Sequence, residues 1–489
     1  MREHSASNAT PDTSPPTTEA VSPHGAHPDS PDGTRTGSRR SATVFTEGSV
    51  AAHLVRLSGF MVMGFLTMTI AQLIEAVYLG IVGTAELAAI AFTFPLVMSL
   101  NAAVRGLGVG GSSVIARVIG SGDHERGARL TSHCLMLVAA FATLCVVAGI
   151  PGSHAFFVLL GAHGRALELA DQYITIWFIG FVFFATSMVG TALMRSAGNA
   201  AMPGIVMTVG SLLQVMIAPF LIFGWIGLPA LGIAGAAWAF VIARLVSFGL
   251  TMYSLAFNER LLRGALHGWL DSTRQILHVG IPAVASNLVP PLSTGVVTRL
   301  LAGFGHGVVA GFSVASRIEA VMSMVVIAVG ASVGPFVGQN WGARQFERVR
   351  EALKLCNGFC VAWGFASFVL MLISARFLVG LINQEPDVVD AASHYLVIIP
   401  LGLGFMGVMG VSSACFNALG KPTPPLVLSL LRLLVLLIPL ALIGRDIAGY
   451  QGVFAATTIT SIIVGVLAWT WNNRTVRGDA NALRAAATA

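Results

Sequence analysis

The chain has 489 residues, of which 55% are hydrophobic and only 10% charged, and its mean hydropathy is +0.79. A soluble globular domain carries about 25% charged residues, so most of this surface must face lipid. The formal net charge of +6 comes from basic residues between apolar runs, which indicates membrane topology and gives no sign of a nucleic-acid partner.

Residues 1–50 are rich in Ser, Thr, Pro, Gly and Asp, so they predict a disordered cytoplasmic N-terminal tail. From Arg56 onward, apolar runs alternate with short polar connectors. Because a bilayer-spanning helix needs about 20 apolar residues, we predict an all-α membrane protein with twelve transmembrane helices. They are expected at 57–81, 87–115, 130–150, 169–194, 201–225, 232–257, 276–301, 308–337, 351–374, 388–417, 424–444 and 452–471.

The basic residues favour one orientation of these spans. With both termini in the cytoplasm, the outer connectors hold only Arg165, Arg299, Arg376 and Arg445. Most other basic residues then lie on the cytoplasmic side, as the positive-inside rule requires. We therefore expect a multi-pass protein of a bacterial inner (plasma) membrane, with an even number of spans.

The two halves of the chain repeat at an offset of 222 residues, as between Gly120 and Gly342 or Gly198 and Gly420. Six spans return the chain to the same side, so the repeat is parallel. Such duplicated bundles commonly hold a substrate between them and alternate access by rocking. We predict an N-lobe of six helices at 51–257, a cytoplasmic linker at 258–275, a C-lobe of six helices at 276–472 and a cytoplasmic C-terminal tail at 473–489.

Several motifs in this order resemble the multidrug and toxic compound extrusion (MATE) transporters over roughly residues 55–472. They are Ile74–Thr84, Ala192–Asn199, Leu221–Gly224, Gly232–Ala237, Arg317–Glu319 and Pro335–Ala343. The resemblance implies a V-shaped, two-lobe exporter of small amphiphilic, often cationic compounds, driven by protons or sodium ions. It implies no cofactor and no enzyme activity, and we expect a monomer in the lipid bilayer.

Some residues depart from the family pattern. Glu75 stands where the family usually has Asp, Gln214 where it often has Asn, and Ala218 where a polar residue often follows one turn later. Pro290 and a neutral stretch near Val408 replace acids that NorM-like members carry. The chain is therefore closer to DinF-like members, whose coupling lies in the first lobe.

Glu75 is the main candidate for ion coupling. A carboxyl group deep in a span costs about 2.5–3.5 kcal/mol on insertion scales, so such groups are functional by default. The alternative is a structural carboxylate that pairs with an Arg or a hydroxyl group. Gln214 either completes a polar cluster with Glu75 or only bonds across helices. A sodium ion needs several oxygen ligands and this site offers few, so we favour H+ over Na+ as the coupling ion.

Other candidates are assigned to substrate binding or gating: Gln72, Tyr78, Asn101, Arg317 and Glu319. Arg317 and Glu319 are two residues apart and cannot face each other on a helix, so each is expected to meet a partner on another helix. Arg105 and Arg244, in contrast, are interpreted as residues that snorkel or face the cytoplasm.

The function that we predict is a secondary active multidrug exporter that exchanges its substrate for H+, or for Na+, by alternating access. Two alternatives remain: a flippase of lipid-linked saccharides from the same superfamily, and an exporter of one specific metabolite. The connectors Asp123–Arg126 and Gln345–Arg348 either form ion pairs that close an inner gate or are solvated loops.

Overall fold

The computed structural model describes residues 44–488 except 228 and 265–266, so most of the predicted tail at 1–50 lies outside the described residues. The described residues are helical, with short turns between helices. The first half contains η1 (Val44–Thr46), α1 (Val50–Val82), α2 (Thr84–Gly120), α3 (His124–Leu159), α4 (Gly164–Ser196), α5 (Ala201–Phe223), η2 (Trp225–Gly227), α6 (Ile233–Tyr253) and η3 (Ser254–Asn258). The second half contains α7 (Trp269–Leu301), η4 (Ala302–Phe304), α8 (His306–Gly342), α9 (Phe346–Gly380), α10 (Pro386–Ile398), α11 (Pro400–Ala418), α12 (Thr423–Leu430), η5 (Leu431–Leu437) and α13 (Ile438–Thr488).

Eleven helical stretches in the described part of the chain are long and apolar enough to cross a membrane. One of them, Thr423–Ala486, has 64 residues and would be about 96 Å long if straight. It reverses at Ala448 and Gly449, whose backbone is not helical. Gly444 and Gly452 consequently pack backbone against backbone. This stretch crosses twice, which confirms the prediction of twelve transmembrane helices.

The tenth span is divided, which the sequence pattern did not predict. It consists of α10 and α11, which meet at Pro400. Proline has no N–H group and disturbs the helix around it. The Thr458 hydroxyl donates a hydrogen bond of 3.0 Å to the Ile398 carbonyl next to this break. A side chain from α13 thus replaces a helical bond that the break removes.

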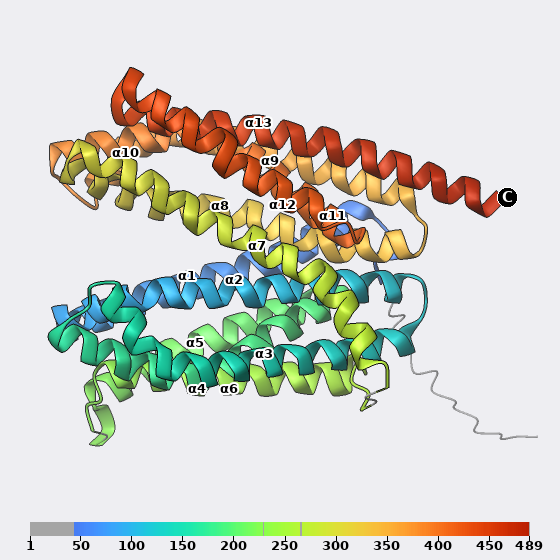
Figure 1. Cartoon of the computed structure of the whole chain (residues 1–489), viewed down its shortest axis with the longest axis horizontal. Helices are drawn as coiled ribbons and strands as arrows, with labels where there is room; N and C mark the ends of the chain where they lie inside the picture. Colours follow the sequence, from blue (N-terminus) through green and yellow to red (C-terminus); the bar gives the residue numbers. More distant parts are fainter. Residues whose placement is uncertain (1–43, 228, 265–266, 489) are drawn as a thin grey trace, which may run out of the picture. The chain divides into compact units, whose positions relative to one another are not determined.

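The helices form two bundles, α1–α6 and α7–α13 (Figure 1). Figure 1 shows α7 at the boundary between them, and its main contacts include α2 of the first bundle as well as α12 and α13 of the second. Each bundle has a buried apolar core of its own. In the first bundle this core contains the ring of Trp177, which stacks at 5.1 Å on Phe181 and at 5.5 Å on Phe240.

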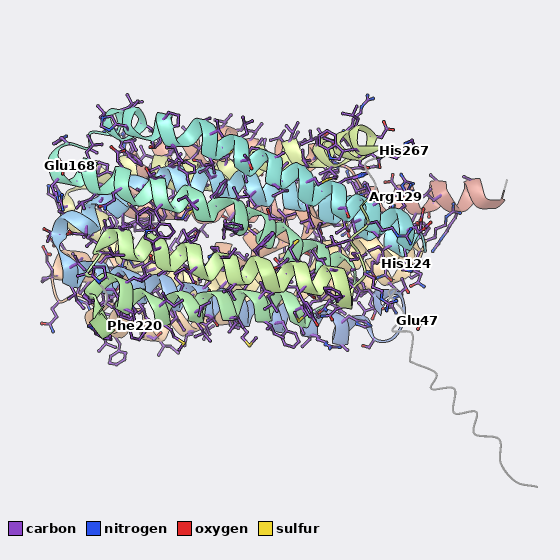
Figure 2. All side chains as sticks on the ribbon, turned by 90° about the horizontal axis from the view of Figure 1, so that it is seen from below. Glu47, His124, Arg129, Glu168, Phe220 and His267 are labelled. Atoms are coloured by element: carbon purple, nitrogen blue, oxygen red, sulfur yellow. The ribbon has the colours of Figure 1, made fainter. Side chains whose placement is uncertain are left out.

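Both ends of the described chain lie at the same end of the bundles, which we call the terminal end. Figure 2 shows Glu47, His124 and His267 at this end and Glu168 at the opposite, far end. Arg484 near the end of α13 donates to Glu347 at the start of α9, at 2.8 Å. An even number of passes accounts for this arrangement.

The internal repeat is visible in the backbone. Gly198 and Gly420, which follow α4 and α11, adopt positive φ angles of 102° and 78°. L-residues with a side chain rarely adopt such angles. Both glycines therefore end a helix with the same turn at equivalent positions, although the residues around them differ.

Three boundaries differ from the expected ones. Residues 44–50, placed in the N-terminal tail, form η1 and the start of α1. The expected linker at 258–275 contains the first turns of α7, and the expected C-terminal tail continues α13 as helix from residue 473 to Thr488. The division into lobes at 51–257 and 276–472 stays a prediction.

Candidate functional site

Glu75 and Gln214 lie together inside the first bundle. The Gln214 Nε2 group on α5 donates a hydrogen bond of 2.8 Å to Oε2 of Glu75 on α1. Gln214 is 8% exposed and Glu75 is half-buried. The structure thus brings together the two residues assigned to ion coupling, and their role in coupling stays a prediction.

Arg244 completes this cluster, and its interpretation as a snorkelling or cytoplasm-facing residue was wrong. Its Nη2 group donates to Oε1 of Gln214 at 2.7 Å. The guanidinium carbon lies 5.6 Å from the ring centre of Phe184 and 5.1 Å from that of Phe240, within cation–π range. Arg244 lies midway along the 21 residues of α6, so its depth was the signal that could have identified it.

Glu75, Gln214 and Arg244 form a relay in which one amide separates two opposite charges. Tyr173 of α4 is buried beside them and interacts electrostatically with both charged groups. The Arg244 Nε group is buried and has no hydrogen-bond partner among the described residues. We call these four residues the first-bundle cluster.

The second bundle contains a related cluster with a different arrangement. The Tyr395 hydroxyl on α10 donates a bond of 2.5 Å to Glu319 on α8, and Arg432 on η5 interacts electrostatically with this carboxylate. Tyr395 is the repeat equivalent of Tyr173. The acid and the base, however, come from different helices in the two bundles.

The remaining predicted site residues do not join these clusters. Arg317 is exposed and makes no hydrogen bond or ion pair with the described residues, so the expected partner on another helix is not there. Gln72 is exposed, and Tyr78 packs edge-on against Phe223 at 6.0 Å. Asn101 on α2 has a buried Oδ1 atom to which no group in the described part of the chain donates a hydrogen bond.

The two bundles are joined at the terminal end by a pair of reciprocal contacts that sequence reasoning missed. Arg117 of α2 donates from Nη1 to the Ala418 carbonyl at the end of α11, at 2.5 Å. Gln339 of α8 donates from Nε2 to the Ser196 carbonyl at the end of α4, at 2.7 Å. These residues are repeat equivalents, so each bundle caps a helix of the other. We call this pair of contacts the cross-cap.

Close backbone packing surrounds the cross-cap. A Cβ atom on Gly120 would overlap the Gln339 carbonyl oxygen, and one on Gly342 would overlap that of Arg117. In the described part of the chain, the hydrogen bonds between α1–α6 and α7–α13 all lie in the half of the protein toward the terminal end. The bundles are therefore held closed at this end.

The connectors considered for an inner gate form no ion pair across the bundles among the described residues, although Arg126 donates a hydrogen bond of 3.5 Å to Gln275 on α7. Glu125 forms an ion pair with Arg263, and Glu347 pairs with Arg350 at 3.0 Å and Arg484 at 2.8 Å. Each pair stays within its own half of the chain. Among residues 44–488 as described, no group of three His, Cys, Asp or Glu side chains could hold a metal ion.

Comparison with known proteins agrees with this architecture. The MatE family profile matches residues 61–220 and 282–443, one segment in each bundle. A Shewanella oneidensis protein named FAD transporter is 32% identical over 407 residues, which cover 82% of this chain and 90% of that relative. The probable multidrug resistance protein YoeA of Bacillus subtilis is 22% identical over 409 residues, covering 81% and 88%.

Among solved structures, a mutant of the Vibrio cholerae MATE transporter VcmN has a TM-score of 0.85 at 28% identity. This likeness covers 90% of the present chain and 99% of that chain. Family profile, curated relatives and fold agree over both bundles. The chain therefore belongs to the MatE family, and it is a multi-pass membrane transporter of small molecules rather than an enzyme.

Proposed function

We propose that this chain is a secondary active exporter whose coupling ion is a proton bound at Glu75. In the proposed orientation the terminal end faces the cytoplasm of a bacterium and the far end faces outward, because most connector arginines lie at the terminal end. The cross-cap then closes the cytoplasmic side. This is one of the two states that alternating access requires.

The observation that carries the proposal is the relay from Glu75 through Gln214 to Arg244. Loss of water disfavours a charged carboxyl group, whereas a nearby guanidinium group favours it. The amide of Gln214 holds the two charges apart, so they form no direct ion pair. Small movements of α1 against α5 and α6 would change both the access of water to Glu75 and its distance from Arg244. Such movements would therefore let the carboxyl group bind or release a proton.

The orientation of Gln214 supports a proton over sodium. Its amide nitrogen faces Glu75, and its amide oxygen accepts from Arg244. Sodium needs several oxygen ligands. The N–H group of Gln214 instead takes the place beside the Glu75 carboxylate where a sodium ion would bind. The proposal keeps the coupling site in the first bundle, where the predicted likeness to DinF-like members would put it.

Two classes of cargo are candidates. The multidrug relatives favour varied amphiphilic compounds, including cations. A second candidate is an anionic amphiphile such as FAD. It follows from the name of the Shewanella relative and from the presence of arginines without an acidic partner. Glu75 and Glu319 each interact with an arginine, whereas Arg105 and Arg317 are exposed and have no acidic partner among the described residues.

The test is transport by the purified protein in liposomes, with FAD or an amphiphilic dye cation inside and either a pH gradient or a sodium gradient imposed. We expect cargo movement to follow the pH gradient in the wild type and to be lost in Glu75→Gln. The matched control is Glu168→Gln, which removes an exposed carboxylate at the far end. Undiminished proton-driven movement in Glu75→Gln would exclude the coupling role, and movement driven by sodium alone would exclude the proton.

A further inference from the structure

A groove of about 690 Å³ lies at the terminal end, between the first turns of α7, the end of α2 and the turn after α11. Ligand sites in proteins commonly have volumes of about 300–1,000 Å³. The groove is separate from both polar clusters described above, because none of their residues lines it. It therefore has room for a ligand of its own.

The side chains of the groove are basic. Arg117 comes from α2, and Arg274 and His278 come from one face of α7, one helical turn apart. No Asp or Glu is among the described residues that line it. Arg274 and His278 make no hydrogen bond or ion pair with the described part of the protein. Three basic groups without a counter-charge favour an anion.

Arg117 has donors to spare. A guanidinium group has five N–H donors, and the described hydrogen bonds of Arg117 all leave from Nη1, toward Ser113, Asn417 and Ala418. Its guanidinium also packs on Gly420, where an added Cβ would lie 3.2 Å from Nη2. Donors at Nη2 and Nε suit a bidentate contact with phosphate oxygens.

The depth of these groups matches lipid headgroups. The 37 residues of α2 span about 56 Å, so its ends extend about 13 Å beyond a hydrocarbon core of about 30 Å. Arg117 lies three residues before the end of α2, and Arg274 five residues after the start of α7. Beside them on α7, Leu270 is 75% exposed and Ile281 is 61% exposed. The groove thus has an open apolar flank next to its basic residues.

We propose that this groove binds the headgroup of an anionic phospholipid. The phosphate lies between Arg117 and Arg274, His278 donates a further hydrogen bond, and an acyl chain follows Ile281 into the bilayer. Basic pockets between helices on the cytoplasmic side are suited to such lipids, because that leaflet carries the anionic headgroups. The inference rests on the proposed function only for the orientation of the terminal end.

The experiment is native mass spectrometry of the full-length protein in detergent, titrated with phosphatidylglycerol, phosphatidylcholine or inorganic phosphate. We expect one phosphatidylglycerol to bind to the wild type and to Arg129→Gln, an exposed arginine at the same end. The double variant Arg274→Gln with His278→Gln should bind it at least about fivefold more weakly. Arg274→Lys, which keeps the charge, should retain most of the affinity.

Equal affinity of the wild type and the double variant for phosphatidylglycerol would overturn the proposal. Equal binding of phosphatidylcholine would also overturn it, since the zwitterionic lipid lacks the net charge that the groove selects. Displacement of the lipid by millimolar inorganic phosphate would overturn the lipid proposal, because it would show a site for the free ion. Transport is not measured, so failure of proton coupling at Glu75 would leave these outcomes unchanged.

Discussion

The Gln214 amide is hydrogen-bonded to a carboxylate on one side and to a guanidinium group on the other. Its replacement by a residue of similar size without polar atoms removes both bonds at once. The charged groups of Glu75 and Arg244, which are both half-buried, then lose the partner that they share. Leaving buried polar groups unsatisfied costs about 1–3 kcal/mol, and more for charged groups.

We therefore expect Gln214→Leu to lower the melting temperature of the purified protein in detergent and to abolish proton-driven transport. Light scattering or tryptophan fluorescence on heating gives the first result, and the liposome assay gives the second. Gln172→Leu, at an exposed position, is the matched control. If both variants melt at the same temperature, the relay does not stabilise the first bundle.

At this scale the sequence predicted the acid but not the base. Glu75 was identified because a carboxyl group within an apolar span is costly and therefore has a reason to be there. Arg244 was missed because a long basic side chain can reach the membrane surface from several depths. Only the positions of α1, α5 and α6 in space show that its guanidinium group points inward, toward Gln214.

At the scale of helices, the cross-cap depends on two side chains that differ in charge. Arg117 makes a charge-assisted bond to α11, worth about 1.5–3 kcal/mol, whereas Gln339 makes a neutral bond to α4, worth about 0.5–1.5 kcal/mol. Each bond also satisfies a carbonyl group that a helix end leaves unpaired. Most of the closing energy of the cross-cap therefore comes from Arg117.

We expect Arg117→Gln to shift the protein toward a state that is open at the terminal end. Spin labels at Ser121→Cys and Ala343→Cys, which follow α2 and α8, would report this shift by pulsed electron resonance. The distance distribution should gain a longer component in Arg117→Gln but not in the control Arg129→Gln. A distribution unchanged from that of the wild type would contradict a closing role for Arg117.

Helix positions were largely predictable, whereas helix interruptions were not. Long apolar runs determine where a chain crosses a bilayer, and the expected boundary between the last two spans, 444–452, contains the observed reversal at Ala448 and Gly449. The break between α10 and α11 escaped notice because Pro400 lies within one continuous apolar run. A proline within a span either kinks the helix or divides it. Here the hydroxyl group of Thr458 donates to the Ile398 carbonyl at the break.

At the scale of the whole molecule, the proposed orientation makes a direct prediction. His124 at the terminal end and Glu168 at the far end are both exposed. We expect Glu168→Cys to react with a membrane-impermeant maleimide on intact cells, and His124→Cys to react only after permeabilisation. Four of the five native cysteines are buried and the fifth, Cys145, is half-buried, so the unmodified chain is the background control. The reverse labelling pattern would invert the topology.

The repeat also explains why the closed end was harder to foresee than the fold. An offset of 222 residues predicts two related bundles, because duplicated sequences adopt duplicated structures. It does not predict how the bundles meet, since their contact depends on individual side chains such as Arg117 and Gln339. The equivalent residues differ there, so a comparison of the halves alone does not mark them as partners.

The two hydrogen bonds of the cross-cap differ in strength, and this difference determines the order in which they break. The neutral bond between Gln339 and the end of α4 is expected to rupture first, while Arg117 still holds the end of α11. Opening would then begin as a lateral gap beside α4 and α8 and pivot about the α2–α11 edge. In the proposed orientation, cargo would then enter from the cytoplasm between α4 of the first bundle and α8 of the second.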